Sequence, residues 1–174
     1  MANARSSSVA REDFDAFYRR EFAGMVVLAS AILGRRAGAE DVVQDAMVDA
    51  HRRWERIGDY DAPRGWLHRV VVQRALKVNR RRSNERAAHL RASVTTNGAE
   101  SAAELDPGLR TCLEALPTQQ RAAMALHYLA DLSLEQIGDG LGISEGTVKT
   151  HLTRGRSRMA SMLRADQTGG GSRG

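Results

Sequence analysis

The chain has very little cysteine and no long apolar run, and each absence excludes a class of protein. Cys112 is the only cysteine among 174 residues, so neither an internal disulfide framework nor a cysteine-based metal cluster can form. A reducing cytoplasm is the natural setting for such a chain. The longest apolar run, Gly24 to Gly34, is too short to span a bilayer, and the first residues, MANARSSSVARED, lack the apolar core of a signal peptide. We therefore expect a cytoplasmic protein with no membrane insertion.

Proline and strand-like alternation are also scarce, and apolar residues recur at helical spacing instead. The spacing predicts helices over about 14–33, 39–57 and from Pro63 onward, then from Gly108, from Thr118 to about Ala130 and from Leu134. Residues 92–107 are small, polar and acidic, with too little apolar surface for a core. The predicted fold is all-α: two small helical domains (10–91 and 108–165) joined by a flexible acidic linker (92–107), with a disordered tail (166–174).

Patterns typical of catalysis are missing as well. The five histidines are scattered, with no HExxH pattern and no paired spacing for a metal. No glycine-rich loop that could cradle a phosphate is present. We therefore expect no enzymatic activity, no catalytic or metal-binding residue and no cofactor.

What the sequence does contain is a formal net charge of +5 and a helix-turn-helix pattern near its end. Ser133 and Gln136 have the spacing of a capping box, which predicts a helix from Leu134. Gly142 permits a tight turn, and Ser144 can cap the helix that follows. Two short helices with a turn of three to four residues are the layout of the DNA-binding motif.

The second helix of this motif has two distinct faces when it is unrolled at about 100° per residue. Val148, Leu152, Gly155 and Met159 share one face, which we assign to the core. The opposite face and its edges carry short polar side chains and cations: Gly146, Thr147, Lys149, Thr150, His151, Thr153, Arg154, Arg156, Ser157 and Arg158. Central residues can reach base edges in a major groove while lateral cations meet phosphates, and Arg154 is the best candidate for a guanine contact. The alternative is a solvated basic face on an ordinary helical hairpin.

The helix from residue 39 presents acids on its outer side. Asp41, Gln44 and Asp45 project away from the core stripe, with Val48 among them. An acidic patch is unsuited to DNA and indicates a protein partner with basic residues. The alternative, a plain solvated face, fits the residues equally well.

The helix from Pro63 is basic and has an aromatic residue near its start. Trp66, Arg69, Gln73, Lys77 and Arg80 lie along one side. An aromatic ring beside cations suits unstacked bases of a single strand. Two alternatives stay open: packing of Trp66 in the core, which is the more common use of such a residue, and a general phosphate clamp formed by the arginines.

Three stretches together resemble one family. The residues AEDVVQDAMVDAHRRWERI, APRGWLHRVVVQRAL and ALPTQQRAAMALHYLADLSLEQIGDGLGISEGTVKTHLTRGRSRM are similar, in order and spacing, to the extracytoplasmic-function (group four) sigma factors of bacterial RNA polymerase. The similarity runs from about Asp13 to Leu163, and the Arg- and Ala-rich composition favours an actinobacterial member.

The resemblance implies a role for each surface. Asp41, Gln44, Asp45 and Val48 of region two would dock on the clamp helices of the largest polymerase subunit. Flipped minus-ten bases would be captured by Asp59, Tyr60, Asp61, Arg64, Trp66, Arg69, Gln73, Lys77, Arg80 and Arg81. The minus-thirty-five duplex would be read in region four by Thr147, Lys149, Thr150, His151, Thr153, Arg154, Arg156 and Arg158.

The resemblance also implies partners. Core RNA polymerase would be contacted a second time, because the apolar outer surface of region four would pack on the flap of the second-largest subunit. The linker would thread the RNA-exit path, and an anti-sigma protein that covers both domains is a further expected partner. Val72-Gln73, Lys77 and Thr153 depart from the family pattern, which affects the promoter sequence and not the role. The main alternative function is a helix-turn-helix transcription factor of the response-regulator type.

Overall fold

The computed structural model describes residues 12–88 and 105–169 of the chain, which form eight α-helices without a strand. The N-terminal domain holds α1 (Phe14–Leu33), α2 (Ala39–Arg52), α3 (Trp54–Ile57) and α4 (Pro63–Ala88). The C-terminal domain holds α5 (Pro107–Glu114), α6 (Thr118–Tyr128), α7 (Leu134–Leu141) and α8 (Glu145–Gly169). The all-α prediction is therefore confirmed. None of the helices in the described part of the chain has the length and apolar character to cross a membrane.

The N-terminal domain is built on three mutually packed helices, α1, α2 and α4. Their apolar stripes meet in a core in which these side chains are almost fully buried: Phe17, Met25, Leu28, Ile32, Val43, Leu67 and Val71. The helix α1 ends where the sequence predicts, because Gly34 adopts a positive φ of 68° and its N–H returns to the carbonyl of Ser30.

The helix predicted over residues 39–57 is interrupted, and this part of the prediction is wrong. Arg53 leaves the helical conformation (φ −118°, ψ 15°), which separates α2 from the single turn of α3. The break lets the Trp54 ring lie 4.7 Å from Phe17 and 5.4 Å from Phe14, measured between centroids. Aromatic packing and a hydrogen bond from Trp54 Nε1 to the Glu12 carbonyl (3.2 Å) therefore outweigh one continued helix.

Three further boundaries differ from the sequence-based ones. The helix α5 begins at Pro107 and not at Gly108, because the Asp106 carboxylate caps it by accepting from Leu109 N–H at 2.9 Å. The helix α6 ends at Tyr128 and not near Ala130. Residues 166–169 continue α8, so the expectation of a tail from residue 166 is wrong for them. Residues 92–104 of the expected linker lie outside the described residues.

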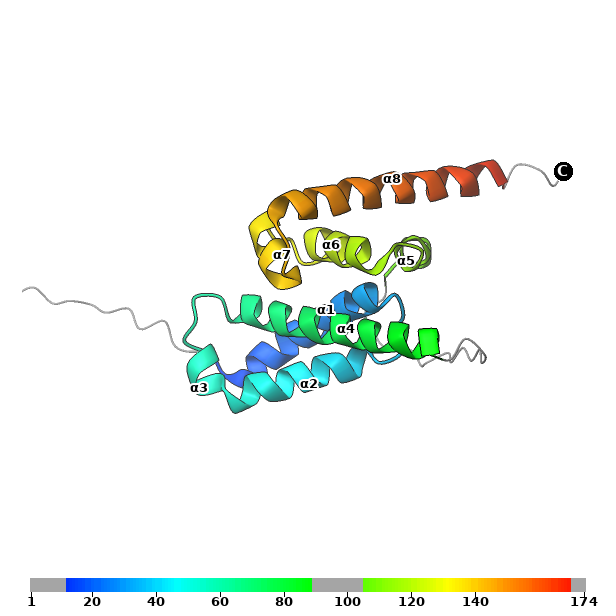
Figure 1. Cartoon of the computed structure of the whole chain (residues 1–174). Coiled ribbons are helices and arrows are strands. Elements are labelled where there is room, and N and C mark those ends of the chain that lie inside the picture. The colour runs from blue at the N-terminus through cyan, green and yellow to red at the C-terminus, as the bar shows by residue number, and fades with distance from the viewer. Residues whose placement is uncertain (1–11, 89–104, 170–174) are drawn as a thin grey trace, which may run out of the picture.

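The C-terminal domain places α6 against α8, with α7 crossing at one end and α5 closing the other (Figure 1). Its core includes Leu126, Ile137, Val148 and Leu152, and it also buries the cysteine, Cys112.

The two domains pack on each other, which the sequence does not foretell. The helix α6 lies along α1, and α7 lies against α4, so the C-terminal domain sits directly on the N-terminal one (Figure 1). Buried apolar residues of both domains belong to one continuous cluster. The contact thus joins two helical units into one packed body.

Candidate nucleic-acid and protein interfaces

The helix-turn-helix is formed by α7 and α8, and its local signals behave as the sequence predicts. Gln136 N–H donates to Ser133 Oγ (3.2 Å) and Ser133 N–H donates to Gln136 Oε1 (3.0 Å), which completes the capping box. Gly142 has a φ of 69° and ends α7. Ser144 Oγ accepts from Thr147 N–H (3.3 Å) at the start of α8. Both helices are therefore fixed by their own caps.

The two faces of α8 are those expected. Val148 and Leu152 are buried, as is Gly155, and Met159 is half-buried. Of the residues expected to read duplex DNA, His151 is half-buried and the others are exposed: Thr147, Lys149, Thr150, Thr153, Arg154, Arg156 and Arg158. The arrangement leaves a polar and cationic face of one helix open to a ligand, and DNA contact by these residues stays a prediction.

Two hydroxyl groups on this face are already used by the helix. Thr150 Oγ1 donates to the Gly146 carbonyl at 3.0 Å, and the hydroxyls of Thr147 and Ser144 lie 2.9 Å apart in a hydrogen bond. A base edge would compete with these bonds for the hydroxyls. The exposed side chains of Thr153 and Arg154 are then the better placed for direct readout.

Tyr128 of α6 holds one of the lateral cations and was missed by sequence reasoning. Arg156 Nε donates to Tyr128 Oη at 2.7 Å, and the guanidinium lies 5.8 Å from the ring centroid. Because Nε is used in this bond, the two terminal nitrogens of Arg156 can turn toward a phosphate. The two residues are 28 positions apart. No local pattern in the sequence signals such a pair.

The acidic face on α2 is exposed, as expected, but part of its charge is paired within the chain. Asp41, Gln44 and Asp45 are exposed, and Val48 has 47% of its surface accessible. Arg74 of α4, which sequence reasoning missed, lies 3.2 Å from Asp45 and 2.5 Å from the half-buried Asp49. Arg74 pairs with Asp45 and Asp49 and not with Asp41, so the carboxylate of Asp41 is the one on this face that a basic partner could bind without displacing Arg74.

The residues expected to capture single-stranded bases fall into three groups. Asp59, Tyr60, Asp61 and Arg64 lie in or beside the loop between α3 and α4 and are exposed. Exposed positions on α4 are Arg69, Gln73, Lys77, Arg80 and Arg81. Trp66 is half-buried and packs against the core, which favours the packing alternative for its ring. The cations of α4 thus form an exposed surface, and the half-buried Trp66 ring lies at the first turn of the same helix.

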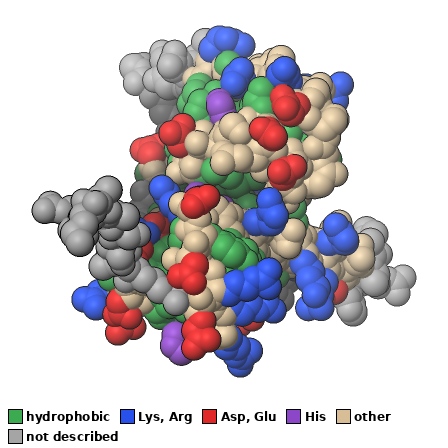
Figure 2. All heavy atoms as spheres, turned by 90° about the vertical axis from the view of Figure 1, so that its left-hand side faces the viewer, with side chains coloured by type: hydrophobic (Ala, Val, Ile, Leu, Met, Phe, Trp, Pro, Cys, Tyr) green, Lys and Arg blue, Asp and Glu red, His purple; other side chains and the backbone are tan. Residues whose placement is uncertain are grey.

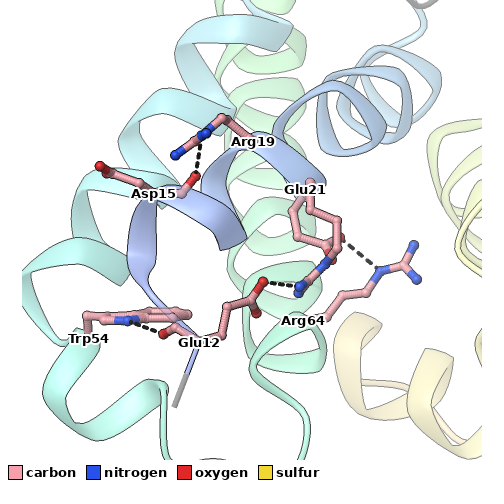
Figure 3. A network of polar contacts seen from close by, with 7 residues as sticks. Glu12, Asp15, Arg19, Glu21, Trp54 and Arg64 are labelled. Carbon is pink, nitrogen blue, oxygen red and sulfur yellow. Dashed lines mark hydrogen bonds and ion pairs between the residues drawn. The ribbon is translucent and has the colours of Figure 1, made fainter. Parts of the chain in front are cut away.

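Arg64 is anchored by a carboxylate buried in α1 (Figure 3). Glu21 is 6% exposed, and its two oxygens lie 3.1 Å from Arg64 Nε and 2.7 Å from Arg20 Nε. Arg20 also pairs with Glu12, and its hydrogen bond to Glu21 raises the pKa of the Arg20 guanidinium. Sequence reasoning missed Glu21, although a signal existed: it stands four residues from both Phe17 and Met25 on the buried stripe.

His68 of α4 is buried between the domains. It is 3% exposed, and neither ring nitrogen has a hydrogen-bond partner among the described residues. Burial, reinforced by the nearby Arg64 guanidinium, lowers the pKa of His68 to about 4. The imidazole is therefore neutral near pH 7. It borders a cavity of about 110 Å³ that α4 shares with α6 and α7.

A second, larger hollow lies within the C-terminal domain. Its volume is about 360 Å³, and its walls come from α5, α6 and α8: Leu109, Leu113, Met124, Ala125, Tyr128, Leu129 and Met159. Every lining residue except Tyr128 is aliphatic. The hollow is suited to an apolar side chain of a protein partner.

Charge is distributed unevenly over the molecule. Figure 2, which views the side bearing α3 and α7, shows Lys and Arg side chains at the top of the C-terminal domain and along one side of the N-terminal domain. Acidic side chains lie between these groups. The surfaces expected to bind anions are thus separated by carboxylates.

Comparison with known proteins assigns both halves of the chain. Residues 17–86 match the model of sigma-70 region 2, and residues 108–159 match the model of sigma-70, region 4. The chain is 32% identical over 159 residues to the ECF RNA polymerase sigma factor SigM of Mycobacterium tuberculosis, covering 91% of this chain and 81% of that protein. It is 30% identical over 190 residues to the ECF RNA polymerase sigma factor SigW of Bacillus subtilis, covering 94% and 97%.

Solved structures share the fold. The sigma factor RpoE in complex with the anti-sigma factor NepR, from Bartonella quintana, has a TM-score of 0.71 at 23% identity and covers 88% of this chain and 98% of that one. CnrH in complex with the cytosolic domain of CnrY has a TM-score of 0.60 at 22% identity, with 88% of each chain covered.

Proposed function

The chain belongs to the extracytoplasmic-function sigma factors of bacterial RNA polymerase, and on that premise we propose how its surfaces share the recognition of a promoter. It is an alternative sigma factor: it binds core RNA polymerase and directs transcription initiation to specific promoters. The observation that carries this function is the presence of both sigma-70 regions, in order, in one chain. The alternative of a response-regulator-type factor has no support, because region 2 occupies the place of a regulatory domain.

We assign the minus-thirty-five duplex to α8. Its open face has Thr153 and Arg154 at the centre and Lys149, Arg156 and Arg158 at the edges. A bidentate arginine can select guanine, while edge cations bind phosphates of any sequence. The capped N-terminus of α8 adds a favourable dipole for the DNA backbone.

We assign the melted minus-ten strand to the loop before α4 and to α4 itself. Arg64, Arg69, Lys77, Arg80 and Arg81 would bind the strand's phosphates, and exposed Tyr60 offers a ring on which a flipped base can stack. Because α4 binds the minus-ten strand only after the two DNA strands have separated, the free energy of this binding stabilises the open promoter and favours melting.

We assign core polymerase to two other surfaces. The exposed acids of α2 fit the clamp helices of the largest subunit, with Val48 supplying an apolar contact. The apolar hollow between α5, α6 and α8 fits the flap of the second-largest subunit. Once core polymerase holds both domains, they bind the promoter together. Binding of one element then raises the effective concentration of the other domain at its own element, so two weak contacts give a high overall affinity.

The proposed setting follows from this role. The chain acts in the cytoplasm together with RNA polymerase, and the polymerase catalyses RNA synthesis. This subunit recognises the promoter and binds the melted strand, without enzymatic activity of its own. An anti-sigma protein is the expected inhibitor. One of the similar solved structures is the sigma factor RpoE in complex with the anti-sigma factor NepR.

The deciding experiment is run-off transcription with core polymerase on a genomic library, with mapping of the start sites. We expect initiation at a limited set of sites that share two sequence elements at fixed spacing. Initiation at random positions would contradict the proposal, and so would tight occupancy of an operator by the chain alone as a dimer.

A further inference from the structure

One arginine of α4 bridges two carboxylates of α2. The two helices pack side by side in the N-terminal domain (Figure 1). Arg74 reaches across from α4, and its two terminal nitrogens divide between Asp45 (Nη1 to Oδ2, 3.2 Å) and Asp49 (Nη2 to Oδ2, 2.5 Å). Because Arg74 keeps 34% of its side chain exposed, the bridge lies at the edge of the contact between the helices and not in the core.

The two acids of this bridge differ in their access to solvent. The side chain of Asp49 is 29% exposed, whereas that of Asp45 is 71% exposed. An ion pair with a well-exposed carboxylate is screened by water and salt, so the Asp45 contact is the weaker of the two. Asp49 therefore holds the guanidinium, and the contact with Asp45 can be exchanged for another cation.

The spacing of the bridged acids repeats one turn earlier on α2. Asp41 precedes Asp45 by four residues, as Asp45 precedes Asp49, and residues four apart lie on one face of a helix. Asp41 is exposed and takes no part in the Arg74 bridge. Asp41 and Asp45 thus offer an arginine of a partner the same spacing that Asp45 and Asp49 offer Arg74. Asp45 belongs to both pairs.

The bridge is not needed to hold the two helices together. Their contact is already formed by buried apolar side chains, which include Ala46 and Met47 of α2 and Val71 and Ala75 of α4. A half-exposed ion pair adds little to such a core. The stronger effect of Arg74 is on the surface, where it offsets the charge of Asp45 and places a like charge beside any incoming cation.

We propose that Arg74 limits the affinity of the chain for core polymerase, because it competes for Asp45 with a polymerase arginine that would otherwise bridge Asp41 and Asp45. The proposal rests on the docking role assigned to the acids of α2 above. At a given concentration the chain then occupies less core polymerase than an otherwise identical chain without this arginine.

The test compares Arg74→Gln with Arg19→Gln in the full chain. Each variant removes one positive charge from the N-terminal domain. Arg19 is exposed on α1 and donates to the carbonyl of Asp15, whereas Arg74 contacts the acids of α2. Titration of the fluorescently labelled chain with core RNA polymerase gives the affinity. The titration is repeated from about 0.1 M to about 1 M salt, over which the Debye length falls from about 10 Å to about 3 Å.

We expect Arg74→Gln to bind core polymerase about three- to tenfold more tightly than the parent chain at the lowest salt, and we expect this gain to shrink as salt is added. Arg19→Gln should stay within about twofold of the parent.

A second pair of variants covers the case in which Asp45 and Asp49, left without a cation between them, repel and destabilise α2. Asp49→Asn removes that repulsion. In the Asp49→Asn background, Arg74→Gln should again tighten binding.

Unchanged or weaker binding after loss of Arg74 in both backgrounds would overturn the proposal and leave the bridge as a brace between helices. An equal gain from Arg19→Gln would also overturn it, because the effect would then belong to the net charge of the chain. Failure of the docking role itself has a different signature: Asp41→Arg would then assemble with core polymerase normally, whatever the result at Arg74.

Discussion

The surfaces on α8 and α4 are both rich in arginine, yet they differ in how far they are ready to bind. On α8 the cations stand on an uncovered helix whose start is fixed by its own cap, and Arg156 is oriented by Tyr128. On α4 two of the groups are engaged inside the chain: Arg69 pairs with Asp139 of α7, and Trp66 packs against the core. A duplex exists before the protein arrives and can be read by a rigid face, whereas a melted strand appears only during initiation. The less available surface is the one that we assign to the later step.

The largest expected effect comes from loss of polymerase binding, because neither the α4 surface nor the α8 surface can then act at a promoter. Asp41→Arg places a cation on the α2 face that is proposed to dock on polymerase. We expect the affinity for core polymerase to fall by about 4 kcal/mol, roughly 1,000-fold, so that neither DNA surface functions. Co-purification and titration with core enzyme measure this loss. Asp15→Arg, the same change on exposed α1, is the control, and normal assembly by Asp41→Arg would contradict the docking face.

Acid should destabilise the folded chain, because His68 of α4 is buried. Its pKa of about 4 in the folded chain lies below the ordinary value of 6.5. As pH falls below 6.5, His68 becomes protonated in the unfolded chain, whereas in the folded chain it stays neutral until the pH reaches about 4. The free energy of unfolding should therefore fall by up to about 3 kcal/mol over this window and level off below it. Urea unfolding against pH measures this loss, and His68→Leu should lack it. Parallel curves for the two proteins would contradict the assignment.

The claim that α8 reads sequence can be tested with a matched pair of arginines. Arg154→Ala should cost about 1–3 kcal/mol at one base pair of the upstream element and relax the preference there. Arg158→Ala should weaken all sequences alike and reduce the salt dependence by about one ion. Promoter-variant binding by the holoenzyme at several salt concentrations distinguishes the two effects. Equal weakening of every sequence by Arg154→Ala would show that it binds only the backbone.

On the α4 side, the readiness of Arg64 depends on Glu21. Glu21→Gln keeps the shape but removes the charge, and we expect capture of the minus-ten oligonucleotide to weaken by about 1 kcal/mol. Glu12→Gln belongs to the same network without touching Arg64 and serves as the control. A lower melting temperature with unchanged strand affinity would reduce Glu21 to a structural role.

The smallest effect concerns the orientation of Arg156. Tyr128→Phe keeps the ring under the guanidinium and removes the hydroxyl that accepts from Nε. Duplex affinity should fall by about 0.5 kcal/mol, equally for all sequences, because a phosphate contact is less well aligned. Unchanged affinity at low salt would mean that Arg156 does not bind DNA or needs no support.

Features that depend on residues close together in the sequence could be predicted from it, whereas contacts between residues far apart in the sequence could not. The capping box at Ser133, the turn at Gly142 and the two faces of α8 are local patterns, and the structure confirms them. Arg74, Tyr128 and Arg121 act on residues 25 to 89 positions away, and no local pattern encodes such pairs. The break at Arg53 was missed because the packing of Trp54 on α1 overrides helix continuation. Glu21 was missed although its spacing on the apolar stripe predicted burial.

Cys112 has a practical consequence for watching this molecule at work. Its side chain is sealed inside the C-terminal domain, with 3% of the residue accessible, so maleimide dyes should spare it while the protein is folded. Cysteines introduced at exposed Glu55 and Glu135 would then take a donor and an acceptor fluorophore without removal of the native thiol. Energy transfer between them would follow single molecules in real time as polymerase loads.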